Sequence, residues 1–166
     1  NAAEIAIAGW WLDEIWDLIR VLAPMLTSDI RALTPTIERA MPSGLTTIGD
    51  HDVIIERDAH VEPMVLLDAT DGPILIRSGA RIAAFTRLVG PCVIGEDTTV
   101  GGGRVATCAI GERCRVHGEL STTIFIGHAN KAHDGLVGHS IVGRWANLGA
   151  STVTSNLKNT YGTVAL

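Results

Sequence analysis

The chain has 166 residues, of which 46% are hydrophobic and only 4% aromatic, and its formal net charge is −5. This length suits one domain with a short appendage, and the core has to be built from aliphatic side chains. The 13 basic residues are scattered, which excludes the basic surface that nucleic-acid binding requires. Three cysteines without a CxxC pair indicate neither a disulfide framework nor a cysteine-rich zinc site, and they fit a reducing cytoplasm.

The N-terminal segment, from residue 4 to about residue 33, is predicted to be helical. Its apolar residues follow the spacing of one helical face: Trp11, Ile15, Leu18, Ile19 and Leu22. Pro24 is expected to end or kink this helix, and a second short helix is expected around 28–33. Four charged residues interrupt the stretch 5–26, which also lacks a signal-peptide cleavage pattern. We therefore expect neither membrane attachment nor a secretion signal.

Residues 34–44, TPTIERAMPSG, are expected to form a loop or an extended connector. The whole segment 1–44 is therefore predicted to be an appendage to the domain that follows. Its helix either packs on its own domain or links that domain to another one, and the residue pattern alone leaves both alternatives open.

From residue 45 onward, aliphatic residues recur every six positions. The period runs without a break through Ile76, Ile82, Leu88, Ile94 and Val100. A period of six fits neither a helix nor a hairpin, and it is typical of a parallel β-helix with three short strands per triangular coil. Eighteen glycines provide tight corners, and breaks in the period predict short insertions near 68–73 and 103–109. Residues 45–166 are thus predicted to be a mainly β domain, a β-helix, which by itself predicts no chemistry.

The repeat weakens after Val116, where polar residues replace aliphatic ones. One polar cluster, 128-HANKAHDGLVGHS-140, contains three histidines, and a second follows at 151-STVTSNLKNTYG-162. The two lysines of the chain, Lys131 and Lys158, lie one in each cluster. In solenoid proteins, departures from the repeat tend to map to loops on the binding face, so we expect the functional site here.

These clusters are suited to acid–base chemistry. A histidine can accept a proton from an attacking amine near neutral pH if a second group orients it. His133 is therefore a candidate general base, and the alternative is an exposed loop histidine without a role. The three clustered histidines match no helical metal-ligand motif, so we expect no metal site. The other histidines fall at ordinary repeat positions and are expected on the surface: His51, His60 and His117.

The stretch 130-NKAHDGLVGHSIVGRWANLGASTVTSNLKNTYG-162 resembles the acetyltransferase domain of bifunctional sugar nucleotidyltransferases, which make UDP-N-acetylglucosamine. It is most similar to the bacterial branch described as UDP-N-acetylglucosamine diphosphorylase/glucosamine-1-phosphate N-acetyltransferase. The stretch 16-WDLIRVLAPMLTSDI-30 resembles the helical linker after the nucleotidyltransferase domain of that family. The resemblance implies a left-handed β-helix, a cytoplasmic homotrimer, acetyl-CoA as co-substrate and no metal in this domain.

The resemblance also implies roles for individual residues. His133 would deprotonate the amine of glucosamine 1-phosphate as it attacks the acetyl thioester, with Asn156 beside it. Ala150 would lie at the corner that meets the acetyl group and coenzyme A. Substrate contacts are implied for Lys131, at the sugar phosphate, for Asn147, and by neighbourhood for Asp134, Lys158 and Tyr161. Leu136 stands where the better-known uridyltransferase branch has a tyrosine.

The chain has no glycine-rich nucleotide-binding start, so we do not expect it to form the UDP-sugar bond, and the nucleotidyltransferase domain is expected to be missing. Family members continue for several coils beyond the SNLKN segment. We therefore expect a fragment of a larger protein, which leaves the completeness of its acetyl-CoA site open. Two alternatives remain: a trimerisation module without catalysis, and a hexapeptide acyltransferase for another sugar acceptor.

Overall fold

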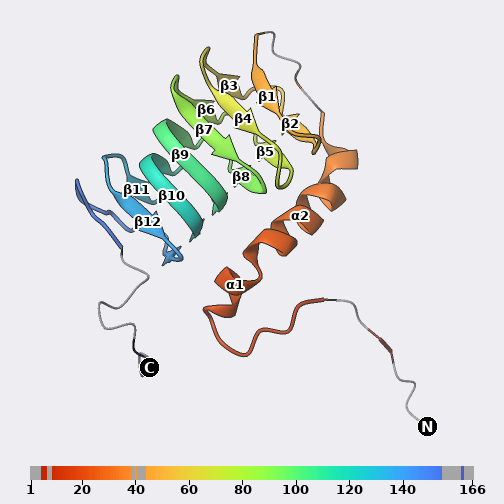
Figure 1. Cartoon of the computed structure of the whole chain (residues 1–166), viewed down its shortest axis with the longest axis vertical. Helices are drawn as coiled ribbons and strands as arrows, with labels where there is room; N and C mark the ends of the chain where they lie inside the picture. The colour runs from red at the N-terminus through yellow and green to blue at the C-terminus, as the bar shows by residue number, and fades with distance from the viewer. Residues whose placement is uncertain (1–4, 7–8, 39, 41–43, 155–161, 163–166) are drawn as a thin grey trace.

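The computed structural model describes residues 5–6, 9–38, 40, 44–154 and 162 of the chain. From residue 46 the described chain winds into a left-handed parallel β-helix of about six turns, preceded by short helices. Figure 1 shows the turns stacked along one axis, with the helices along one flank. The six-residue period therefore predicted the fold class correctly.

The strands form three stacks, which we call the first, second and third faces. The first face contains β1 (Thr46–Ile48), β4 (Leu66–Asp68), β7 (Thr86–Val89) and β12 (Leu136–Gly138). The second face contains β2 (Val53–Ile55), β5 (Ile74–Ile76), β8 (Cys92–Ile94) and β13 (Ile141–Val142). The third face contains β3 (His60–Val61), β6 (Arg81–Ile82) and β11 (Asn130–Lys131). Two long strands turn corners and join all three faces: β9 (Thr99–Ile110) and β10 (Arg115–Phe125).

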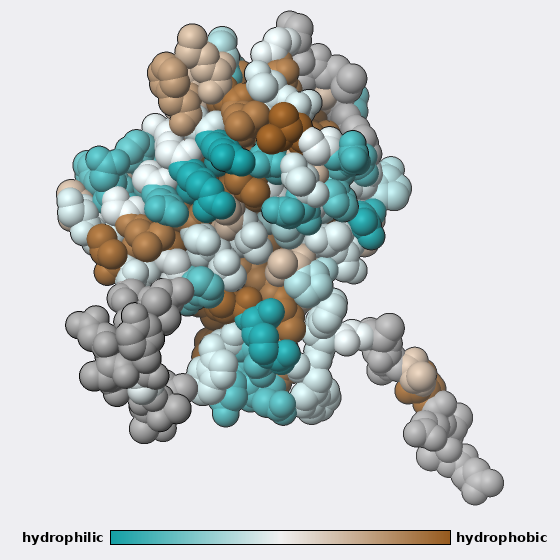
Figure 2. Space-filling view, in the orientation of Figure 1, coloured by the Kyte–Doolittle hydropathy of each residue, from teal (hydrophilic) through white to brown (hydrophobic). Residues whose placement is uncertain are grey.

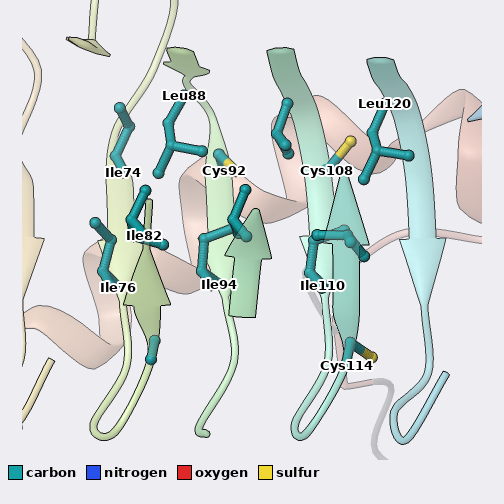
Figure 3. Packing of buried hydrophobic residues seen from close by; sticks show 14 of the residues in the cluster. Ile74, Ile76, Ile82, Leu88, Cys92, Ile94, Cys108, Ile110, Cys114 and Leu120 are labelled. Carbon is teal, nitrogen blue, oxygen red and sulfur yellow. The ribbon is translucent and has the colours of Figure 1, made fainter. Parts of the chain in front are cut away.

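Parallel pairing places each inward side chain on the inward side chain of the turn before it. On the second face one such column reads Ile55, Ile76, Ile94, Ile110 and Phe125. On the first face the column reads Leu67, Leu88, Val105, Leu120 and Val137. All ten side chains are buried, and Figure 3 shows several of them stacked in rows. This continuous apolar burial stabilises the solenoid and accounts for the small number of aromatic residues.

The turns differ in length. His60 pairs with Arg81, twenty-one residues later, and Arg81 pairs with Thr99, eighteen residues later. The insertion predicted near 68–73 is confirmed, because it lies in this longer turn. The insertion predicted near 103–109 is wrong. Thr99 pairs with Arg115 only sixteen residues later, so the period shifts because the corners there are short.

The helical prediction for 4–33 was too long. The structure has α1 (Asp17–Arg20), α2 (Leu22–Leu33) and a 3₁₀ turn, η1 (Thr34–Thr36), and the chain from 9 to 16 is not helical. The two helices are separated at Val21, because Pro24 has no N–H for the carbonyl of Arg20 and its ring crowds that carbonyl. The second short helix expected at 28–33 is instead the end of α2.

The apolar face of the N-terminal segment is buried only in its second half. Trp11 and Ile15 are 82% and 68% exposed, contrary to the predicted continuous face. Within α2, Ile30 packs against Ile54 and Leu75 on the outside of the second face. The helix thus packs on its own domain. A link to another domain stays a prediction.

The described residues contain no helix that is long and apolar enough to cross a membrane. The three cysteines are free and buried. Burial raises the pKa of the Cys108 thiol to about 12, so this group is not a nucleophile near neutral pH.

The two phenylalanines of the chain provide a matched test of the packing. Phe125 is 1% exposed in an inward column, between Ile110 and Val142, whereas Phe85 is 77% exposed at a corner. Phe125→Ala is expected to lower the free energy of unfolding by about 3–5 kcal/mol because it leaves a cavity. Phe85→Ala is expected to change the free energy of unfolding of the single chain by less than about 0.5 kcal/mol, because the Phe85 side chain is exposed there. Urea denaturation measures both, and equal losses would contradict the packing described above.

Stability should depend on the ionisation of Asp68. Its carboxylate accepts a hydrogen bond from Arg87 Nη2 at 2.6 Å and another from the Thr70 N–H, and these contacts lower its pKa. The folded chain therefore gains stability from the carboxylate above the unfolded pKa of about 3.9 and loses it as pH falls through the lower folded pKa.

The variant Asp68→Asn should accordingly be less stable than the parent at pH 7, and the difference should disappear near pH 2 in urea titrations. Asp97→Asn is the control, because its partner Arg113 lies 3.5 Å away and both side chains are exposed. A difference that persisted unchanged at pH 2 would show that Asp68 acts through packing instead.

Candidate functional site

The corners of the solenoid also stack, and one stack collects most of the described candidate residues. It consists of the turns between third-face and first-face strands, and we call it the His133 corner column. From the N-terminal end it contains Met64, Phe85, the glycine run 101–103, His117, the segment 132–135 and the segment 149–151. Hydrophobic side chains thus occupy the early turns of the column, and polar ones occupy the late turns.

The three histidines of the cluster 128–140 lie on three different corners. His128 lies between β10 and β11, His133 between β11 and β12, and His139 between β12 and β13. One face of the solenoid takes five or six residues, so histidines at this spacing lie on successive corners. The three histidines are therefore close in sequence but not in space. Among the residues that the structure describes, no group of three or more histidine, cysteine or acidic side chains could hold a metal ion.

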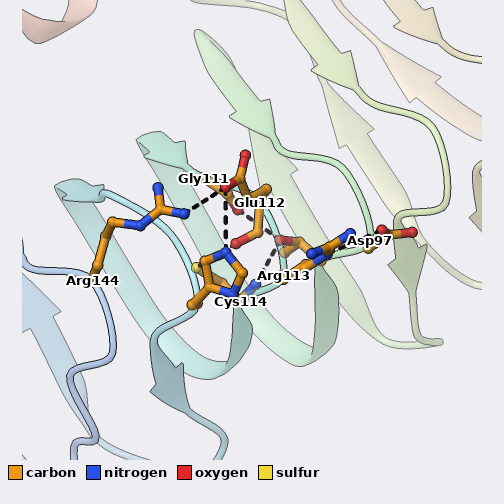
Figure 4. Close-up of polar contacts among 8 residues, drawn as sticks. Asp97, Gly111, Glu112, Arg113, Cys114 and Arg144 are labelled. Atoms are coloured by element: carbon orange, nitrogen blue, oxygen red, sulfur yellow. Dashed lines mark hydrogen bonds and ion pairs between the residues drawn. The ribbon is translucent and has the colours of Figure 1, made fainter.

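His128 belongs to an ion-pair network on another corner. Its Nε2 lies 3.4 Å from Glu112 Oε1, which also accepts a hydrogen bond from Arg144 Nη2 at 2.7 Å. Arg144 and His128 lower the pKa of the Glu112 carboxyl, Arg144 more strongly. Figure 4 shows this network beside the exposed pair of Asp97 and Arg113. We interpret these residues as surface contacts between neighbouring turns, because Glu112 accepts the hydrogen bond of Arg144 and lies beside His128.

Lys131 is completely buried beneath the His133 corner column. Its Nζ donates to the backbone carbonyl of His117 at 3.1 Å and to the backbone carbonyl of His133. Burial lowers the pKa of this ammonium, and the nearby Asp134 carboxylate partly opposes that effect. A contact with a sugar phosphate stays a prediction, and in this chain the ammonium faces backbone carbonyls inside the coil.

His133 itself is exposed at the corner, followed by exposed Asp134. The Oδ1 atom of Asp134 lies 3.2 Å from Nδ1 of His117, on the preceding turn. His117 was expected to be an ordinary surface residue, but the structure places it in the same site. It directly follows the inward residue Val116, which pairs with Lys131. The register of Val116 on Lys131 would have placed His117 beside the segment that carries His133.

Glycines 101–103 make room for this arrangement. A Cβ atom on Gly102 would lie 3.3 Å from the His117 ring, and one on Gly103 would lie 2.2 Å from the backbone oxygen of Gly118. Both glycines also have positive φ angles, 131° and 90°. The run therefore allows the close approach of two turns at this corner and leaves space for the His117 ring.

The remaining candidates are divided between the next turn and the undescribed residues. Asn147 lies on the outside of the third face, where Asn130 Nδ2 donates to its Oδ1 at 2.6 Å. Ala150 is exposed at the His133 corner column, and the neighbouring Ser151 N–H donates to the Asp134 carbonyl at 3.0 Å. Three candidates lie outside the described residues: Asn156, Lys158 and Tyr161.

A cavity of about 180 Å³ adjoins this corner on the first face. Its lining includes Glu119, Leu136 and Thr154. The Thr154 hydroxyl accepts a hydrogen bond from the Gly138 N–H at 2.8 Å, which ties the last described turn to β12. The cavity thus lies beside the segment that carries His133, and Leu136 forms part of its wall.

No protein-family model matches the chain, and no curated protein matches it.

The glycine run can be tested by substitution. Gly103→Ala should destabilise the chain by at least about 1 kcal/mol, because the left-handed backbone disfavours a side chain and the Cβ atom would strike the next turn. Gly143→Ala is the control, since nothing lies within 4 Å of its Cβ position. The two denaturation midpoints measure the effect. A Gly103→Ala variant as stable as the control would contradict the close approach.

Proposed function

We propose that this chain is an acyltransferase domain that transfers the acetyl group of acetyl-CoA to the amine of glucosamine 1-phosphate. The β-helix fold is compatible with hexapeptide acyltransferases. The observation that supports the proposal most is the exposed His133, whose backbone carbonyl is held by the buried Lys131. The resemblance of 130–162 to the acetyltransferase domain supports the choice of substrates.

In the proposed reaction, the amine nitrogen attacks the thioester carbonyl while His133 accepts the amine proton. A C–N bond forms, and the carbonyl oxygen carries negative charge in the tetrahedral intermediate. The intermediate then expels coenzyme A by breaking the C–S bond, and the imidazolium returns the proton to the departing thiolate. The products are N-acetylglucosamine 1-phosphate and the free thiol of coenzyme A.

The neighbouring residues are suited to holding the two substrates. Ala150 is small and exposed, and a Cβ atom on the adjacent Gly149 would meet nothing within 4 Å. This open backbone supports a place for the acetyl group one turn from His133. Asn147 and Asp134 remain the described candidates for sugar contacts. Asn156, Lys158 and Tyr161 complete the proposal from the resemblance alone.

The proposal includes a homotrimer in the cytoplasm, as part of a larger sugar nucleotidyltransferase. Two hydrophobic side chains of the His133 corner column support assembly, because Met64 and Phe85 are 70% and 77% exposed in the single chain. On the face seen in Figure 2, hydrophobic atoms form separate patches between hydrophilic side chains. The same exposed pair favours the second candidate function, a trimerisation module without catalysis.

The variant His133→Gln tests the catalytic role. It should lower the rate of coenzyme A release from acetyl-CoA and glucosamine 1-phosphate by about 10²–10⁴-fold, the usual contribution of general-base catalysis. A thiol reagent measures the release. His60→Gln is the control, because His60 lies on β3 at the other end of the solenoid.

Equal rates for His133→Gln and His60→Gln would contradict the role of His133 as the base. A trimer without activity in the parent chain would favour the assembly module. Faster transfer to another amino sugar in a competition assay would favour the alternative of a hexapeptide acyltransferase for another sugar acceptor.

A further inference from the structure

One inward column contains a polar residue where its other members are aliphatic. On the third face this column reads Val61, Ile82, Val100, Val116 and Lys131. Lys131 therefore occupies a position that the fold otherwise gives to Ile or Val, and its side chain is completely buried. This occurs in the turn that carries His133.

An ammonium group at such a position is costly. Transfer of a charged group from water into the interior is unfavourable unless other groups replace its hydration. Among the described residues, no carboxylate lies within ion-pair distance of Lys131 Nζ, and its hydrogen bonds go to the carbonyls of His117 and His133. The contacts that compensate for its burial thus belong to the two histidines of the corner.

These contacts connect two successive turns. His117 belongs to the turn before His133, and its side chain meets Asp134 on the outside of the same corner at 3.2 Å. The corner segment 132–135 is therefore held from inside by Lys131. Backbone hydrogen bonds hold it from the neighbouring turns, from the Glu119 N–H to the Gly135 carbonyl at 3.2 Å and from the Ser151 N–H to the Asp134 carbonyl at 3.0 Å. A segment fixed on both sides can hold an exposed imidazole in one place.

We propose that Lys131 is a positioning residue, which fixes the backbone of the corner and thereby the place of the His133 imidazole. The catalytic part of this inference rests on the proposed function. It assigns Lys131 to the support of the base, in place of the expected contact with the sugar phosphate. These two roles predict different kinetics. A purely structural role predicts faster amide exchange throughout the solenoid.

The variant Lys131→Met keeps the length and the apolar stem of the side chain but removes its donors. We expect a folded chain in which kcat falls about 10–100-fold, since small displacements of a catalytic group are costly in rate. The KM for glucosamine 1-phosphate should change less than about twofold. Ile82→Met is the matched control, because it places methionine in the same column, three turns away.

Hydrogen–deuterium exchange provides a readout that does not depend on activity. In Lys131→Met, amide exchange should become faster in peptides that cover 117–118 and 132–135, and it should remain unchanged in peptides around β3 and β6. If the parent chain proves inactive but this local change appears, the positioning role stands and the proposed function fails. If Lys131→Met does not fold, Lys131→Ile replaces it in both measurements, because it also removes the donors and matches the aliphatic residues of the column.

Two results would overturn the inference. A raised KM for glucosamine 1-phosphate with an unchanged kcat would show that Lys131 binds the phosphate. Exchange that is unchanged at the corner, or faster throughout the solenoid, would show that Lys131 does not hold this corner in particular.

Discussion

The in-register stacking of successive turns is the constraint on which the rest of this structure depends. Neighbouring parallel strands lie about 4.8 Å apart, so each residue lies close to one residue of the turn before and one of the turn after. An inward position must continue an apolar column, as Ile76, Ile94 and Ile110 do. A corner position points away from the core and is free to carry chemistry. The division between core and site follows from that geometry.

The corners themselves show how strongly the stacking acts on the backbone. Phe85, Asp97, Arg113 and Trp145 all have positive φ angles, a region that such residues disfavour. The columns on either side hold these corners in place. The exposed side chains of the late turns, including His133, are therefore carried by a rigid backbone. Where a polar residue interrupts an inward column, as Lys131 does, its ammonium group donates hydrogen bonds to backbone carbonyls at a corner.

Much of this fold could be predicted from the sequence, because the six-residue period reports the columns directly. The N-terminal segment was overpredicted, since the spacing of Trp11 and Ile15 suits a helical face that the tertiary structure does not bury. For the site, the sequence indicated the segment 128–140, and the structure adds that its three histidines lie on different corners. The spacing of His128, His133 and His139 already indicates successive corners once one face is known to take five or six residues. The burial of Lys131 and the position of His117 could not be predicted without the length of each turn. That length varies from fifteen to twenty-one residues.

Under the proposed function, the reacting amine of the acceptor lies at His133, on the corner that Lys131 supports from inside. The most direct test of this placement is a crystal structure of the chain with glucosamine 1-phosphate bound. We expect the amine nitrogen about 2.6–3.2 Å from an imidazole nitrogen of His133, the distance at which a general base accepts a proton. An acceptor bound on another face, with its amine out of reach of His133, would contradict it.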